Sequence, residues 1–189
     1  MRDTKRKPSN SASVAQQPDE NVCAGHALGF PLRSSLGFRP IENVTLDVFR
    51  CVCEVYATAS AQPWEIALRI SEEQLGAIDG PLLVARVTAL LRALRKERGN
   101  GFSYLSVGCQ HVSPDELTVT GLLKAARNGD KNAFERGIAL ALDNAEISDR
   151  TRIAVRSLAE TQSSHSAALD DEAGASDFEK QTVQAVYLH

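Results

Sequence analysis

The amino-acid sequence predicts an all-α protein: an irregular or orthogonal bundle of five to six helices with a disordered N-terminal head and an acidic C-terminal tail. Three observations support this fold class. Apolar residues recur at helical spacing through the middle of the chain. Typical helix-start and helix-stop residues bracket those runs. Both ends are too polar to offset the entropy of ordering. We therefore divide the 189 residues into a head (1–40), a helical core domain (41–160) and a tail (161–189) that holds a short helix.

The head is rich in Lys, Arg, Ser, Asn and Pro and has few apolar residues before Leu28. From there to Pro40, apolar residues alternate with Gly and Pro, which favours an extended arm lying on the core. A flexible interaction motif is the alternative. The basic start of the chain is followed by polar residues 8–20 where a secretion signal needs an apolar run, so we expect no such signal. Export by a specialised secretion system stays open.

The first core element is predicted to be a buried helix over residues 44–58. Its β-branched residues would also suit a strand, but Asp47, Arg50 and their polar neighbours form one narrow strip at helical spacing. Pro63 ends or interrupts this helix. The following segment, 64–70, fits either a strand or a helix.

Two helices are predicted in the next part of the core. A short one spans residues 71–78, begins at a capping-box pattern and is closed by Asp79 and Gly80. A longer one spans 82–98, has its apolar residues on one face and carries several cations in its last turns, where they complement the helix dipole. A Gly-Asn-Gly sequence from residue 99 stops it, and an extended connector follows.

The last part of the core is predicted to be an αα-hairpin followed by one more helix. Ser113 and Glu116 form a capping box for a helix that runs to about residue 127. Gly129 ends it and Asp130 caps the next helix. Ser148 caps the final helix, whose apolar side is expected to hold Ile153, Ala154 and Leu158.

The composition excludes several classes of protein. A formal net charge of only −3 gives no chain-wide attraction to nucleic acid. No apolar run is long enough to span a membrane. Four cysteines are too few for a disulfide scaffold in a chain of this length, so we expect reduced thiols and a cytoplasmic location.

Three short pairs could supply metal ligands: Cys23 with His26, Cys51 with Cys53, and Cys109 with His111. Thiolate and imidazole together suit zinc. On a helix, however, Cys51 and Cys53 point about 200° apart and are expected to pack in the core. Cys23 and His26 could join a site only by ordering a long arm. Cys109 and His111 thus remain the candidate metal ligands, and no cofactor is expected.

No recognisable catalytic motif is present, and we expect that the protein is not an enzyme. Cys109 precedes a helix start, where its pKa could be lowered, which would suit a nucleophilic or redox-sensitive thiol. Its neighbour His111, however, has no assignable orienting carboxylate.

Charge is segregated along the chain. Residues 86–98 carry five basic side chains and one acidic one, whereas residues 160–189 carry six acidic side chains and one lysine. These runs are typical of solvated surfaces. They also suggest a regulatory contact in which the tail competes with a partner for the basic helix end. The candidate partner-binding residues are Arg92, Arg95, Lys96 and Arg98.

The leading functional hypothesis is a cytosolic helical adaptor or regulator that acts through protein contacts. One alternative is a DNA-binding regulator that uses the basic end of the 82–98 helix. Its helix-turn-helix form would need a turn at Asp79 and Gly80, but the following helix starts with apolar residues where a recognition helix needs polar ones. The other alternative is a metal- or redox-responsive protein centred on Cys109 and His111.

Overall fold

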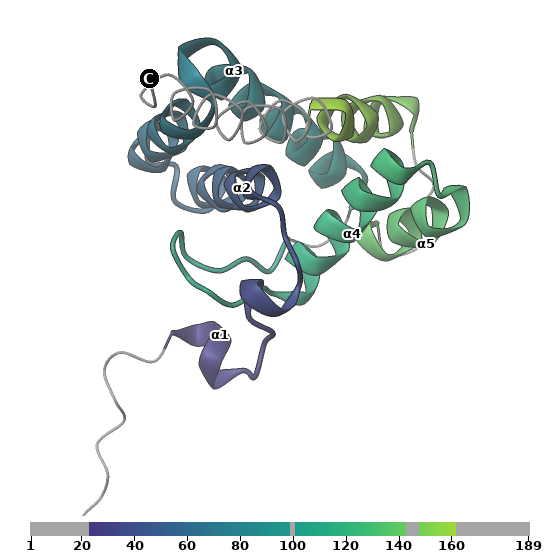
Figure 1. Cartoon of the computed structure of the whole chain (residues 1–189), viewed down its shortest axis with the longest axis horizontal. Helices are drawn as coiled ribbons and strands as arrows, with labels where there is room; N and C mark the ends of the chain where they lie inside the picture. Colours follow the sequence, from purple (N-terminus) through teal and green to yellow (C-terminus); the bar gives the residue numbers. More distant parts are fainter. Residues whose placement is uncertain (1–22, 99–100, 143–147, 162–189) are drawn as a thin grey trace, which may run out of the picture.

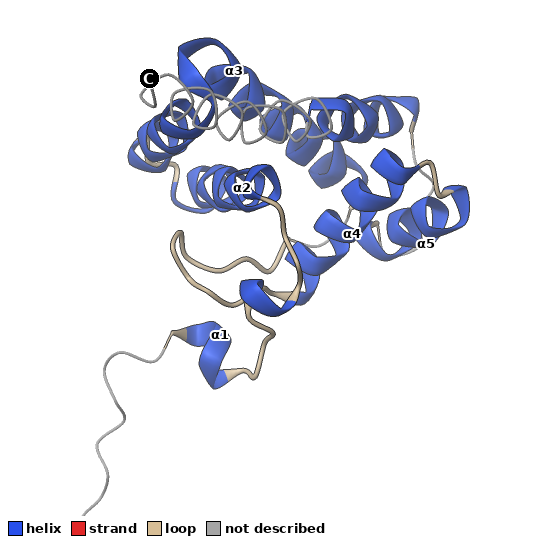
Figure 2. Ribbon diagram, in the orientation of Figure 1, coloured by secondary structure: helices blue, strands red, loops and turns tan. Residues whose placement is uncertain are grey.

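A computed structural model describes residues 23–98, 101–142 and 148–161 of the chain. This part is helical and contains no strand; an isolated antiparallel bridge joins Leu32 to His111 (Figure 2). The helices are α1 (Ala24–Ala27), α2 (Pro40–Thr58), α3 (Gln62–Glu97), α4 (Pro114–Asn128), α5 (Lys131–Ala141), a short 3₁₀ helix (Arg33–Ser35) and a final helix over residues 149–161. The predicted all-α bundle is confirmed. Residues 1–22 of the head and 162–189 of the tail lie outside the described residues.

Helix α2 confirms the buried helix expected from residue 44 onward. Pro40 occupies its first turn, and the Glu42 carboxylate accepts a hydrogen bond from the Arg39 backbone N–H at 2.9 Å. The helix ends at Thr58, and Ala59 takes a left-handed conformation. Its middle turns are fully enclosed by the rest of the molecule.

Helix α3 joins two helical parts at a break, in agreement with the predicted short and long helices, but the first part begins at Gln62 and the break lies elsewhere than predicted. The backbone leaves helical geometry at Gly76 (φ 82°, ψ 173°) and not at Asp79 and Gly80. Glycine reaches this φ without a Cβ clash. Gly80 lies beyond the bend, against the backbone of Ser71 and Glu72, where an added Cβ would approach within 2.6 Å. The segment 64–70, left open between strand and helix, is helical.

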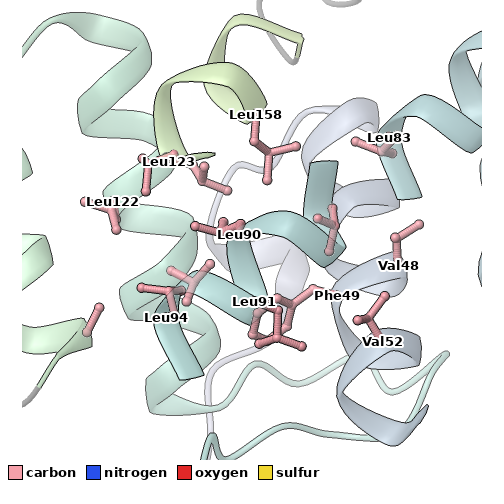
Figure 3. Close-up of a cluster of buried hydrophobic side chains, with 14 of the residues drawn as sticks. Val48, Phe49, Val52, Leu83, Leu90, Leu91, Leu94, Leu122, Leu123 and Leu158 are labelled. Atoms are coloured by element: carbon pink, nitrogen blue, oxygen red, sulfur yellow. The ribbon is translucent and has the colours of Figure 1, made fainter. Parts of the chain in front are cut away.

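The core lies where α2, the second half of α3, α4 and the final helix meet (Figure 3). Leu90, Leu91 and Leu94 of α3 have no exposed surface, and they belong to the same buried cluster as Val48 and Val52 of α2. Leu122 and Leu158 close the core from α4 and the final helix. None of the described helices is both long enough and apolar enough to cross a membrane.

The αα-hairpin and its caps are confirmed. Ser113 and Glu116 make the reciprocal capping box of α4, Gly129 ends it in a left-handed conformation, and the Asp130 side chain caps α5. The face of the final helix was predicted wrongly in one respect. Ile153 is largely exposed, because the buried side of that helix is formed by Thr151, Val155, Leu158 and Ala159.

Candidate metal centre

Residues 23–39, which we call the arm, pack on the core, as favoured for residues 28–40, but the arm holds two short helices and is not extended throughout. Helix α1 directly follows Cys23, and its buried Gly25 lies against the side chain of His111. A Cβ at residue 25 would come within 2.5 Å of the His111 Cβ and 2.9 Å of the Leu105 Cδ1. This close approach places Cys23 beside the connector that links α3 to α4. The disorder predicted for the head therefore does not extend to residues 23–39.

A second set of contacts holds the arm further along the chain. The Arg33 N–H donates to the Gln110 carbonyl at 2.7 Å, and the Val112 N–H donates to the Pro31 carbonyl at 2.9 Å. Arg33 also forms an ion pair with Asp47 of α2. The arm thus runs beside the connector and reaches α2, at the end of the molecule where Figure 1 shows α1.

A buried ion pair forms hydrogen bonds with the backbone of the connector, residues 101–112. The side chains of Arg50 on α2 and Glu116 on α4 have no exposed surface, and the Arg50 Nε lies 2.7 Å from the Glu116 Oε1. The same guanidinium donates to the carbonyls of Cys109 at 2.7 Å and His111 at 2.5 Å. Glu116 also accepts a hydrogen bond from the Leu105 N–H. One arginine therefore fixes the backbone on both sides of residue 110.

These two anchored segments bring three ligand atoms together. The Cys23 Sγ lies 3.2 Å from the Cys109 Sγ and 3.2 Å from the His111 Nδ1, and the Cys109 Sγ lies 4.0 Å from that nitrogen. Cys109 is 8 % exposed, whereas Cys23 and His111 are half-buried. Among the described residues, these are the three side chains that could hold a metal ion together.

Hydrogen bonds and burial shift the pKa values of the two thiols in opposite directions. The Cys109 thiol donates to the Cys23 sulfur, which lowers the pKa of Cys23, and backbone N–H groups of the first turn of α1 act in the same direction. Burial raises the pKa of Cys109. Cys23 is therefore the thiol that more readily becomes the thiolate that a metal requires.

The spacing of the three atoms is close to that of the ligands of one zinc ion. Zinc binds sulfur at about 2.3 Å and imidazole nitrogen at about 2.0 Å, which puts neighbouring ligands of a tetrahedron roughly 3.5 to 3.8 Å apart. The observed separations of 3.2, 3.2 and 4.0 Å bracket this range. A point close to 2 Å from all three atoms exists between them, so small side-chain adjustments suffice to form three corners of a tetrahedron.

His26 lies next to these three residues and offers a fourth ligand. Its ring stands at 82° to that of His111, with the ring centroids 5.6 Å apart. It is exposed, and a rotation about its side-chain torsions would be needed to bring a ring nitrogen to the other three ligand atoms. Cys23, His26, Cys109 and His111 would together form a Cys₂His₂ set, which is a common structural zinc site.

The basic end of α3, where the sequence placed a partner-binding surface, lies partly exposed. The side chains of Arg92, Arg95 and Lys96 are exposed. The Arg95 guanidinium lies 4.2 Å from the centre of the Tyr56 ring. Arg98 is less accessible, since it forms an ion pair with Asp115 at 2.8 Å and covers the Phe102 ring. The helix-turn-helix form of the DNA-binding alternative loses its proposed turn, because α3 bends at Gly76.

Cys51 and Cys53 are core residues, as their position on a helix predicted. Cys51 is 0 % and Cys53 6 % exposed, and both belong to the hydrophobic core. Burial raises the pKa of Cys51 to about 11 and also raises that of Cys53. Neither sulfur belongs to the cluster formed by the other two cysteines.

The sequence pointed to Cys109 and His111 but not to Cys23 as their neighbour, because Cys23 reaches them only when a long arm is ordered. Two signals pointed the other way. Both pairs have short ligand spacings, and a glycine stands between Cys23 and His26, as a close backbone approach would require. Arg50 was placed on a polar strip, but nothing in a single sequence reveals its partners Glu116 and residues 109–111.

Comparison of this chain with protein-family models, with curated proteins and with solved structures gave no match, so the site must be interpreted from its own geometry.

Proposed function

We propose that this chain is a zinc-binding regulatory protein in which one Zn²⁺, held by Cys23, Cys109 and His111, fixes the arm on the helical core. The observation that carries the proposal is the convergence of three ligand atoms, all within 4.8 Å of one another, from two segments far apart in sequence. Two thiolates and an imidazole are soft and borderline ligands that favour zinc over calcium or magnesium.

His26 completes the coordination in this proposal. A fourth protein ligand would close the site and leave no corner for a reacting water, which is the arrangement of a structural zinc rather than a catalytic one. The proposed role is therefore binding and regulation. Ligand loss at His26 should weaken the site without removing it, because three ligands remain.

The metal would control the position of the arm. Helix α1 has only four residues and cannot be stable alone. Without the metal, the backbone bonds at Pro31 and Arg33 and the Arg33–Asp47 pair would have to hold the arm by themselves. Since a ligand that binds only the docked state stabilises that state, zinc would shift the arm toward the core.

The partner surface in this proposal remains the basic end of α3. The exposure of Arg92, Arg95 and Lys96 supports it, since cations meant for an acidic partner must be accessible. A protein partner is preferred to nucleic acid, because the net charge of the chain is −3 and α3 breaks at Gly76 instead of at the turn that the helix-turn-helix form was expected to use.

Zinc titration against a chromogenic chelator, with elemental analysis of the full chain, tests the metal proposal. We expect one zinc per chain in the wild type and in Cys51→Ala, a control that removes a thiol from the core. We expect loss of the metal in Cys23→Ser, Cys109→Ser and His111→Ala, and weakened binding of about 10- to 100-fold in His26→Ala.

The same preparations test the effect on the arm. Hydrogen exchange of residues 23–39 should become faster when a chelator removes the metal, whereas exchange in α4 should change little. A wild-type protein that binds no zinc, or a Cys23→Ser variant that binds it as tightly as the wild type, would refute the proposal.

A further inference from the structure

The two sulfur atoms of the candidate metal centre lie closer to each other than a tetrahedral metal site requires. They are 3.2 Å apart and both cysteines are free thiols, whereas two sulfurs on one zinc ion are separated by roughly 3.8 Å. A disulfide needs about 2.05 Å. The pair therefore stands between the two bonding arrangements, and side-chain rotation can carry it to either.

The local backbone can accommodate that movement. Cys23 precedes the short helix α1, and Cys109 follows Gly108, which has a positive φ of 84° in a turn. Neither cysteine is inside a long helix that would fix the direction of its side chain. The half-buried sulfur of Cys23 is also reachable by a small oxidant, unlike the sulfurs of Cys51 and Cys53.

We propose that Cys23 and Cys109 are a site of reversible oxidation, at which hydrogen peroxide or a related hydroperoxide forms a disulfide and expels the zinc ion. The arm would then be tied to the connector by a covalent bond instead of a metal. Oxidation would thus replace zinc coordination by a disulfide as the link between the arm and the connector. The position of the arm would then no longer depend on the metal.

The chemistry balances with peroxide as the two-electron oxidant. The Cys23 thiolate attacks one peroxide oxygen, the O–O bond breaks, and a sulfenic acid forms on Cys23 while the other oxygen leaves as hydroxide and is protonated to water. The Cys109 sulfur attacks the sulfenic sulfur as its thiolate, which forms by loss of the thiol proton to solvent in the metal-free chain and would already be present as a ligand in the zinc-loaded chain. The S–S bond forms, and the second oxygen leaves as hydroxide and takes a proton to become water. Two sulfurs lose two electrons, and the peroxide gains them.

Zinc release follows from the loss of ligands. A disulfide sulfur is a poor ligand compared with a thiolate, so His111 and His26 would be the only strong donors left. The release of metal rests on the proposed function, but the formation of the disulfide does not. Zinc binding and disulfide formation can therefore be refuted independently of each other.

The experiment treats the zinc-loaded full chain and the metal-free full chain with stoichiometric hydrogen peroxide. Disulfides are located by alkylation and peptide mass mapping, and released zinc is followed with a chromogenic chelator. We expect a Cys23–Cys109 disulfide in both preparations, release of one zinc per chain from the loaded one, and recovery of both thiols and of zinc binding after dithiothreitol.

Two variants make the result specific. Cys51→Ala should form the same disulfide and release zinc as the wild type does. Cys109→Ala should form no disulfide and instead accumulate a sulfenic acid at Cys23 that a dimedone probe can trap.

The inference is overturned if peroxide leaves both thiols unpaired, or if the mapped disulfide joins Cys51 or Cys53. Retention of zinc by the chain that has formed the disulfide also contradicts it. If the wild type binds no zinc but forms the disulfide, the proposed function fails while the oxidation site stands. If the wild type binds zinc but forms no disulfide, the oxidation site is refuted while the proposed function stands.

Discussion

The chain contains two pairs of cysteines in which the separation along the sequence does not predict whether the two side chains meet in the structure. Cys51 and Cys53 are separated by one residue, yet α2 turns their side chains apart and buries both in the core. Cys23 and Cys109 are 86 positions apart, yet their sulfurs lie 3.2 Å from each other. The difference shows that ligand spacing indicates a site only when the secondary structure that carries it is known.

The two pairs also differ in what surrounds them. Cys51 and Cys53 pack among apolar side chains, which makes their thiolates unfavourable. Cys23 has hydrogen-bond donors around its sulfur, and a histidine nitrogen lies 3.2 Å away. Thiol chemistry is therefore expected at the pair joined by tertiary structure, and the experiments that follow can break or sharpen this comparison.

The largest effect is expected from Arg50→Met, which removes the side chain that fixes the backbone around the Cys109 pair. Glu116 would be left buried without its ionic partner, at a cost of about 3–5 kcal/mol of unfolding free energy. Urea denaturation measures this loss. Arg152→Met is the matched control, since its pair with Glu135 is exposed and should be worth about 1 kcal/mol or less.

A double variant separates stability from positioning. Arg50→Met with Glu116→Leu replaces the buried pair by apolar groups and should recover much of the stability, yet it cannot donate to the Cys109 and His111 carbonyls. We expect zinc affinity to stay low in this double variant. Zinc affinity equal to that of the wild type would show that Arg50 does not position the site.

A smaller effect is expected from Gly25→Ala. The added methyl would lie 2.5 Å from the His111 Cβ, so α1 must move away from the connector and carry Cys23 with it. We expect zinc affinity to fall by about 10- to 100-fold, as for changes to groups that hold a metal ligand in position. Gly121→Ala is the control, because nothing lies within 4 Å of its added Cβ. Equal zinc affinities for the two variants would contradict the role assigned to Gly25.

The smallest effect is expected in the order of alkylation of the metal-free protein. The thiolate is the reactive form and exists above the pKa, so the lowered pKa of Cys23 extends its reaction with iodoacetamide to lower pH. Cys51, with its pKa raised to about 11, should react at least roughly tenfold more slowly near neutral pH. Mass mapping across a pH series checks this order, and equal rates at the two residues would remove the distinction between the pairs.

Much of the fold could be predicted from the sequence, because local signals determine it. The cap residues Ser113 and Asp130 and the stop at Gly129 act on their own helices, and α2 shows its helical period despite its β-branched residues. The bend of α3 was misplaced because Asp79 and Gly80 resemble a helix stop. Gly80 instead serves a close backbone contact that only the folded chain reveals.

The site was harder to predict for the same physical reason. Cys23 reaches His111 through the arm's contacts with residues 105–112 and with Asp47, none of which has a local signature. The Ser113–Glu116 box was predicted as a helix cap, and that function is confirmed. The second role of Glu116, the ion pair with Arg50 of α2, depends on how α2 and α4 pack and could not be predicted from the sequence of either helix.

The contact between Cys23 and His111 also closes a ring of chain. The two residues are 88 positions apart, and the segment between them contains α2 and the whole of the bent α3. A link that persisted in the unfolded chain would shrink the unfolded ensemble, by up to about 4–5 kcal/mol for a loop of this length. The Cys23–Cys109 disulfide, which survives unfolding, would stabilise the protein in this way. Zinc, which leaves as the chain unfolds, would act through binding alone.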